Sequence, residues 1–150
     1  MTMFDPVDLI TQAVTERLID AEFTLDFEPT RPDYLEIEPT DHALHVTVFP
    51  RSEIAESWWT QDTDQSEIAI AVVIRRHLET YDPAAVAALK QLAREIRNTL
   101  RNAHPITHLG DYPVNLESIA HDPLWAPELL RTAQLFLSIL LVTYKTEYEV

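Results

Sequence analysis

The sequence predicts an α+β fold, with a mostly antiparallel or mixed sheet of about four to five strands and two main helices packed on it. The chain has 150 residues, 46% of them hydrophobic, which is typical of a single domain over residues 1–150. Segments with helical and with strand periodicity come in separate blocks. Ala133 to Tyr148 contain no Gly or Pro and predict a buried final strand, with Phe136 to Val142 in the middle of the sheet.

Two segments carry helix signals. Asp5 and Pro6 fit the N-cap and first helical positions, and apolar residues at three- and four-residue spacings follow, so we expect a helix over about residues 6–20. Asp82 and Pro83 repeat the signal before a second helix that should end near residue 102. Its apolar stripe consists of Val86, Leu89, Ala93, Ile96 and Leu100.

Alternation of apolar and polar residues predicts the strands of the N-terminal half. Phe23 to Phe27 alternate as a half-buried strand does. Prolines on both sides limit Tyr34 to Glu38 to a short edge strand. Leu44 to Phe49 form a firmer strand, which we expect Pro50 to stop.

The rest of the chain alternates between connections and strands. Arg51 to Gln65 are mostly polar and predict a long connection, and the β-branched run Ser66 to Leu78 predicts a third strand. Residues 103–132 are rich in proline. We expect loops there, around a short strand near Val114 to Ile119 and a helical turn near Glu128 to Arg131.

Charge is distributed unevenly. The net charge of −14 opposes adhesion to DNA or anionic lipid over most of the surface. Only residues 75–104 are net positive. Four cations there recur at helical spacing and form what we call the basic stripe: Lys90, Arg94, Arg97 and Arg101. The stripe is either a solvated helix face or a protein contact, for which the acidic remainder of the chain offers a complementary surface.

Two adjacent tryptophans, Trp58 and Trp59, stand in the polar connection together with Asp62 and Asp64. Large aromatic side chains in an acidic loop favour an interface, because exposed tryptophans often anchor protein contacts. The alternative is that both rings fold back onto the sheet.

Catalytic and cofactor motifs are missing. A single glycine, Gly110, excludes phosphate-binding loops and nucleophile elbows, and the absence of cysteine excludes thiol chemistry. His104 and His108 are four residues apart, but Pro105 argues against a helix that would align them. The sequence DTDQSE lacks the glycine and the distant glutamate of a calcium loop. We therefore expect no enzyme activity, no cofactor and no metal.

The N-terminus shows neither a basic nor an apolar targeting region, and the apolar run near the C-terminus is shorter than the ~20 residues of a membrane helix. We expect no membrane partner.

Several segments in order carry a family resemblance: the amphipathic N-terminal helix, HVTVFP, the polar hairpin into SEIAIAVVIRR, AAVAALKQLAREIRNTL, and FLSILLVTYKTEY. Together they resemble the tail-terminator, or tail-completion, proteins of long-tailed bacteriophages. The resemblance implies a structural subunit of the virion that forms a ring, usually a hexamer, at the head–tail junction. Such a ring caps the tail tube, joins it to the neck or head-completion protein, and lets DNA pass without specific binding.

In this interpretation the basic stripe lies at the subunit interface, and the loop with Trp58, Trp59, Asp62 and Asp64 contacts the tail tube protein. Assembly would take place in the host cytoplasm. Two alternatives remain: another head–tail connector or neck adaptor, and, more distantly, a metal-dependent hydrolase that uses His104 or His108.

Overall fold

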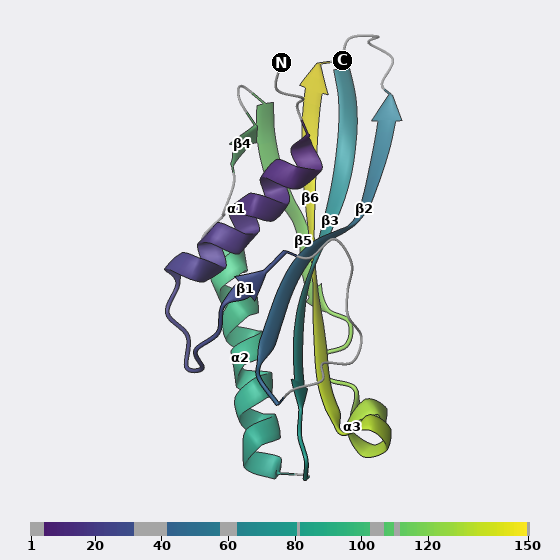
Figure 1. Ribbon diagram of the computed structural model, residues 1–150. Coiled ribbons are helices and arrows are strands. Elements are labelled where there is room, and N and C mark those ends of the chain that lie inside the picture. Colours follow the sequence, from purple (N-terminus) through teal and green to yellow (C-terminus); the bar gives the residue numbers. More distant parts are fainter. Residues whose placement is uncertain are drawn as a thin grey trace.

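The computed structural model describes residues 5–31, 42–57, 63–80, 82–102, 107–109 and 112–149. It confirms the α+β class, and Figure 1 shows long, strongly twisted strands with helices α1 and α2 beside them. The elements in chain order are α1 (Pro6–Asp20), β1 (Pro29–Thr30), β2 (His45–Ser57), β3 (Thr63–His77), α2 (Pro83–Asn102), β4 (His108–Leu109), β5 (Tyr112–His121), α3 (Pro127–Ala133) and β6 (Leu135–Glu149).

The strands form one mixed sheet in the order β1-β2-β3-β6-β5-β4. The β1–β2 pair is parallel and all other neighbours are antiparallel. The sheet exceeds the predicted four to five strands because β1 and β4 contribute two residues each. Strands β2, β3 and β6 have 13 to 15 residues each and run along most of the molecule, whereas β5 has ten.

The final strand, β6, lies in the middle of the sheet, as predicted. It pairs with β3 from Leu135 to Glu149 and with β5 from Leu140 to Thr146. Alternate side chains of β6 enter the core, with Phe136, Leu140, Val142 and Tyr144 all buried. This one strand therefore joins the two halves of the sheet.

Both long helices pack on the same face of the sheet. The buried residues of α1 and α2 share a single apolar cluster with the even-numbered side chains of β3 and β6. The Asp5 carboxylate caps α1 by accepting from the Val7 and Asp8 amides, and Asp82 accepts from the Ala84 amide at the start of α2. Both predicted helices are confirmed, with Leu92 added to the predicted stripe of α2.

Two expectations around Pro50 are wrong. Strand β2 does not stop at Pro50 but continues to Ser57, and the register with β3 shifts between Pro50 and Ser52. Such a shift absorbs a proline in a ladder, and beyond Thr47 no described strand lies on the outer side of β2. Most of the predicted connection from Arg51 to Gln65 is consequently strand, because β3 begins at Thr63.

The predicted strand over Phe23 to Phe27 is also wrong. These residues follow α1 as a loop that pairs with none of the described strands, and strand structure in this segment begins at Pro29. The alternation itself is real, since Phe23, Leu25 and Phe27 are half-buried against the core while the residues between them are exposed. The predicted edge strand over Tyr34 to Glu38 lies outside the described residues.

The region after α2 is more regular than expected. The predicted short strand near Val114 to Ile119 is the centre of the ten-residue β5, and the predicted helical turn is part of α3. Gln134 ends α3 in the left-handed region, at φ 56°. Its side-chain amide donates to the Glu79 carbonyl over 3.0 Å, and its own carbonyl accepts from the Leu78 amide over 2.7 Å. Gln134 thereby ties the start of β6 to the end of β3.

Candidate functional site

The basic stripe lies along one flank of α2, next to the buried face of the helix. Arg94 and Arg101 are exposed, while Lys90 and Arg97 are half-buried. None of the four forms an ion pair with any residue in the described part of the chain, although other surface cations there do. Four cations in a strongly acidic protein thus have no carboxylate partner among the described residues.

At one end of the stripe, Lys90 contacts an aromatic ring. Its ammonium lies 5.0 Å from the centroid of the Trp125 indole, in the connection between β5 and α3. A cation over an indole face is attracted by the negative charge of the π system. The sequence could not reveal this contact, because Lys90 and Trp125 belong to segments separated by β4 and β5.

In the middle of the stripe, Arg94 and Arg97 face His121 at the end of β5. Burial, and then the positive charges of Arg97 and Arg94, lower the pKa of His121. Both ring nitrogens of His121 and the Nε of Arg97 are buried without a hydrogen-bond partner among the described residues. Burial and the positive charge of the stripe therefore both disfavour the protonated form of His121.

The opposite flank of α2 contacts an acidic segment. The Thr24 hydroxyl donates to Oε1 of Glu95, and the Thr24 amide lies 3.4 Å from Oε2 of the same carboxylate. At 100° per residue, Glu95 points roughly 130° away from the centre of the basic stripe around the helix axis. We call residues 20–28 the acidic loop, because its outward-facing side chains include Asp20, Glu22, Asp26 and Glu28, all exposed.

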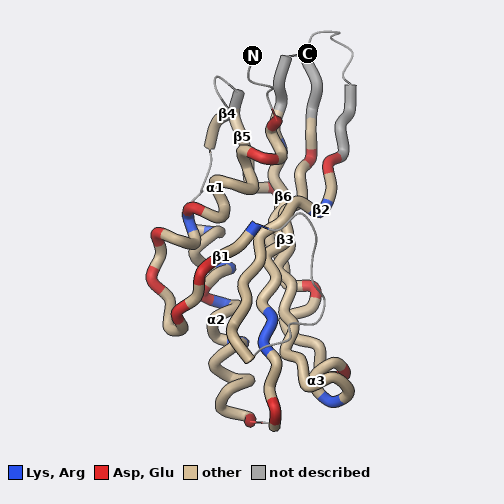
Figure 2. The backbone as a smooth tube through the Cα atoms, viewed as in Figure 1, with Lys and Arg blue, Asp and Glu red and all other residues tan. Residues whose placement is uncertain are grey.

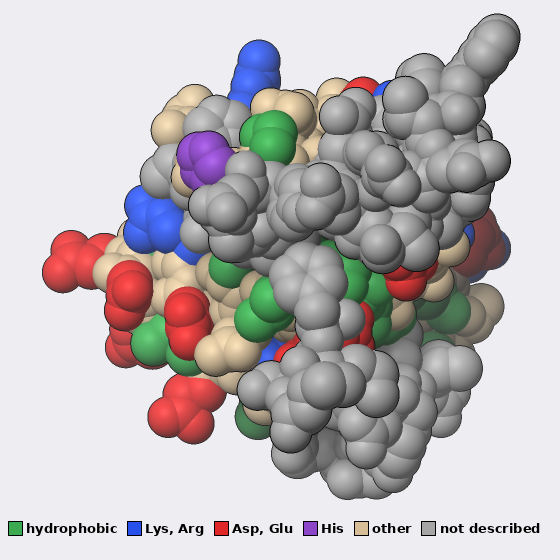
Figure 3. Space-filling view, turned by 90° about the horizontal axis from the view of Figure 1, so that it is seen from above, with side chains coloured by type: hydrophobic (Ala, Val, Ile, Leu, Met, Phe, Trp, Pro, Cys, Tyr) green, Lys and Arg blue, Asp and Glu red, His purple; other side chains and the backbone are tan. Residues whose placement is uncertain are grey.

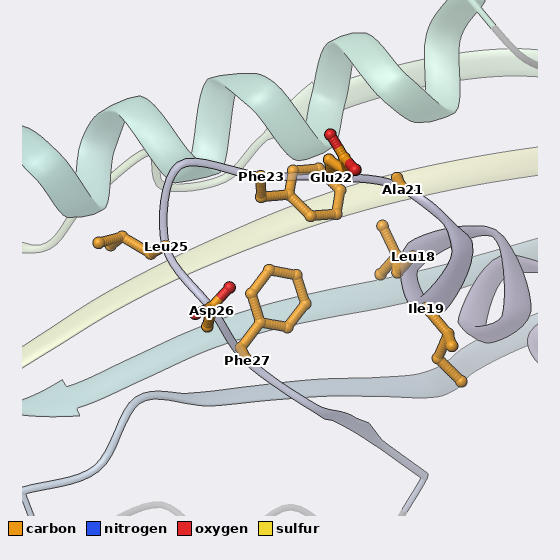
Figure 4. Close-up of a pocket in the computed structure, with 8 residues that line it drawn as sticks. All are labelled: Leu18, Ile19, Ala21, Glu22, Phe23, Leu25, Asp26 and Phe27. Atoms are coloured by element: carbon orange, nitrogen blue, oxygen red, sulfur yellow. The ribbon is translucent and has the colours of Figure 1, made fainter.

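The acidic loop and the end of α1 line a pocket of about 400 Å³ that is open to solvent. Figure 4 shows the rings of Phe23 and Phe27 close together in this space, with Glu22 and Asp26 on the same loop. The two ring centroids are 5.2 Å apart. Ile19, with 60% of its surface exposed, also lines the pocket. The residues that line the pocket include both apolar side chains and carboxylates, a combination that suits the stem and head group of an arginine or lysine.

The outward face of α2 between its two flanks is neutral. Its exposed residues there include Ala84, Ala87, Gln91, Asn98 and Asn102. In Figure 2 the backbone between α1 and β1 carries several Asp and Glu positions, coloured red, and in Figure 3 acidic side chains gather on that same side of the molecule. The helix therefore separates a positive flank from a negative one.

The tip of the β2–β3 hairpin is only partly described. Trp58, Trp59 and Asp62 lie outside the described residues. Asp64 belongs to β3, where it pairs with Ser57 on β2 and Tyr148 on β6. The described strands thus end at Ser57 and begin again at Thr63, and most of the predicted contact residues fall between these two positions.

Possible metal ligands do not form a complete site in the part of the chain that is described. His108 lies on β4 and contacts the Thr107 hydroxyl, and His104 lies outside the described residues. A pair that sequence reasoning missed, His42 and His77, brings the two Nδ1 atoms within 3.1 Å. Glu79 contacts the other nitrogen of His42, at 3.3 Å, so two donor atoms from the described residues converge there.

Neither a protein-family model nor a curated protein matches this chain. None of the described helices combines the length and apolar character that crossing a membrane requires.

Proposed function

We propose that this chain is a structural subunit of the head–tail junction of a long-tailed bacteriophage. Its copies form a ring that caps the tail tube and joins it to the neck. The observation that carries the proposal is the basic stripe, whose cations have no carboxylate partner among the described residues of a chain with net charge −14. A second copy can supply that partner. Contacts between unlike patches of identical subunits close into rings when the rotation permits.

The order of elements supports the same proposal. The resemblance to tail-terminator proteins rests on an N-terminal helix, a long hairpin, a second helix and a final long strand, which correspond to α1, β2–β3, α2 and β6. In this proposal Trp58, Trp59, Asp62 and Asp64 at the hairpin tip contact the tail tube protein, and the other side of the ring contacts a neck or head-completion protein.

The net charge fits a ring through which DNA passes. A predominantly acidic surface repels the phosphate backbone, so DNA can move through the opening without being held. The protein would be found at the head–tail junction of the virion, and in the host cytoplasm during assembly.

Light scattering coupled to size-exclusion chromatography tests ring formation. At low salt we expect a mass several times the 17.3 kDa of one chain, six times for a hexamer, and negative-stain images of closed rings. Raising the salt should lower the mass, because partly exposed ion pairs are screened. A monomer at every concentration and salt would contradict the proposal.

Immunogold labelling of particles from the parent phage tests the location. We expect label at the head–tail junction, and separate heads and tails when the protein is absent. Label confined to the neck of tail-less heads would assign the ring to a neck adaptor instead. Intact virions, with heads joined to tails, that contain none of the protein would contradict the structural role.

A further inference from the structure

We infer that the basic stripe of one copy docks against the acidic loop of the next, with an arginine of the stripe entering the pocket that Phe23 and Phe27 help to line. The inference rests on the proposed ring, and specifies which two surfaces meet and how. The arginine that enters the pocket comes from a second copy of this chain, because the stripe and the acidic loop are opposite in charge.

Both surfaces are positioned by the same helix. Thr24 fixes the acidic loop to Glu95 on one flank of α2, while Lys90 and Trp125 fix the stripe's surroundings on the other. The neutral face of α2 separates the two. When a second copy is displaced sideways, across the axis of α2, its acidic loop faces the basic stripe of the first copy. A rotation about the axis of a ring produces the same arrangement between neighbouring copies. Such a contact joins two different surfaces and is therefore heterologous. An open row of copies has a free stripe at one end and a free acidic loop at the other, and these two meet when the ring closes.

The acidic loop offers more than charge. Its pocket places the apolar surfaces of Phe23, Phe27 and Ile19 next to the carboxylates of Glu22 and Asp26. An arginine is amphipathic in the same way, since its methylene stem packs on apolar surface and its guanidinium pairs with carboxylates. Planar guanidinium groups also stack on aromatic rings. The pocket is thus suited to arginine, and its Ile19 is one of the two large hydrophobic side chains that are exposed in the described part of the chain.

The exposed members of the stripe can reach such a pocket. Arg94 and Arg101 are exposed, whereas Lys90 and Arg97 are held against their own chain. Arg94 and Arg101 are two helical turns apart, about 10 Å along the axis. One of them can enter the pocket while the other pairs with carboxylates at the ends of the loop, Asp20 or Glu28.

The test reverses charge on one surface at a time. Arg94→Glu/Arg101→Glu removes the positive flank, and Glu22→Lys/Asp26→Lys removes the negative one; all four positions are exposed, so both variants should fold. Matched controls make the same changes in net charge elsewhere: Arg51→Glu/Arg131→Glu and Glu67→Lys/Glu79→Lys. We expect each surface variant to need more than about tenfold higher concentration to assemble, and the controls to assemble like the wild type.

Mixing the two variants identifies the partners. Each variant keeps the surface that the other lacks, and the two reversed surfaces also complement each other in charge, so an equimolar mixture should assemble into rings in which the two variants alternate. All four substitutions in one chain reverse both surfaces and should restore assembly. A mixture that stays monomeric, or a quadruple variant that does not assemble, would overturn the pairing of these two surfaces.

The remaining outcomes separate the inference from the proposed function. Wild-type rings together with unaffected surface variants would overturn the docking geometry and leave the ring in place. A monomeric wild-type chain would overturn both. Binding of a short DNA duplex by the wild type, lost in Arg94→Glu/Arg101→Glu, would show that the stripe serves phosphate and would also overturn the inference.

Discussion

The Lys90 ammonium lies 5.0 Å from the centroid of the Trp125 indole, and this contact links α2 to the connection that follows β5. Trp125 also packs against the core cluster as a half-buried residue. The contact fixes one end of the basic stripe to the rest of the fold. Lys90 therefore has a structural role within its own chain.

Trp125→Ala should lower the free energy of unfolding by about 2–4 kcal/mol, because it removes packing as well as the cation–π contact. Lys90→Met keeps the aliphatic stem and should cost less than ~1 kcal/mol. Urea denaturation of both single variants and the double variant gives the coupling energy, for which we expect about 0.5–1 kcal/mol. Additive effects would show that the ammonium and the ring do not interact.

His121 should make stability depend on pH. Burial and the Arg97 and Arg94 charges lower its pKa below the ordinary value of 6.5 in the folded chain. The unfolded chain therefore binds the proton more readily, so stability is lost as pH falls from 6.5 toward the folded-state pKa. His121→Leu should remove this component, and Arg94→Gln/Arg97→Gln should reduce it. Urea denaturation at about pH 7.5 and 5.5 measures how much stability is lost between the two pH values. An equal loss in the wild type and in His121→Leu would contradict the prediction.

Tyr144→Phe should leave the free energy of unfolding unchanged or raise it by up to about 1 kcal/mol. Tyr144 is fully buried, and its hydroxyl has no hydrogen-bond partner among the described residues. Burial raises the pKa of Tyr144 well above its ordinary range. Spectroscopic titration of the folded wild type should show one tyrosine that ionises only when the protein unfolds in alkali, and Tyr144→Phe should lack it. A loss of more than about 1 kcal/mol in the variant would indicate a hydrogen bond that the described residues do not supply.

Leu140→Asp should prevent folding, because Leu140 is buried in the central strand and the aspartate would place an unpaired charge in the core. Leu140→Val is the matched control and should cost only about 1 kcal/mol. Circular dichroism melts distinguish the two. A cooperative melt of Leu140→Asp would mean that the centre of β6 is not buried.

Trp58→Ala/Trp59→Ala should leave the urea midpoint unchanged but impair attachment of the ring to the tail tube, since interface tryptophans often carry much of the binding energy. Co-sedimentation of the variant with tails from the parent phage measures attachment. Glu53→Ala, an exposed change farther down the hairpin, serves as the control. Loss of folding in the double tryptophan variant would place the rings in the core instead.

Local signals predicted the helices well. The Asp-Pro pairs at residues 5–6 and 82–83 act within one helical turn, and the apolar stripe of α2 needs only its own periodicity. The same reasoning located the final strand, because a long apolar run without breakers has few alternatives.

The errors arose where the outcome depends on distant residues. The alternation over Phe23 to Phe27 shows that every second side chain packs against the core. It does not show whether a neighbouring strand is available for backbone hydrogen bonding. Pro50 is tolerated because the ladder with β3 shifts register beside it. For the candidate site, spacing alone predicted the basic stripe, but its contacts with Trp125 and His121 required the path of the chain from β5 to α3.

The central position of β6 also determines when the fold can be completed during synthesis. Strand β3 and strand β5 both pair with β6, yet every other element precedes β6 in the chain. The β2–β3 hairpin can form early, since its partners are adjacent in sequence, whereas β5 has no long partner until β6 leaves the ribosome. Pairing between segments so distant in sequence is slow. The nascent chain consequently exposes the apolar faces of α2 and β3 from their synthesis until β6 emerges, a period in which chaperones have their best opportunity to bind it.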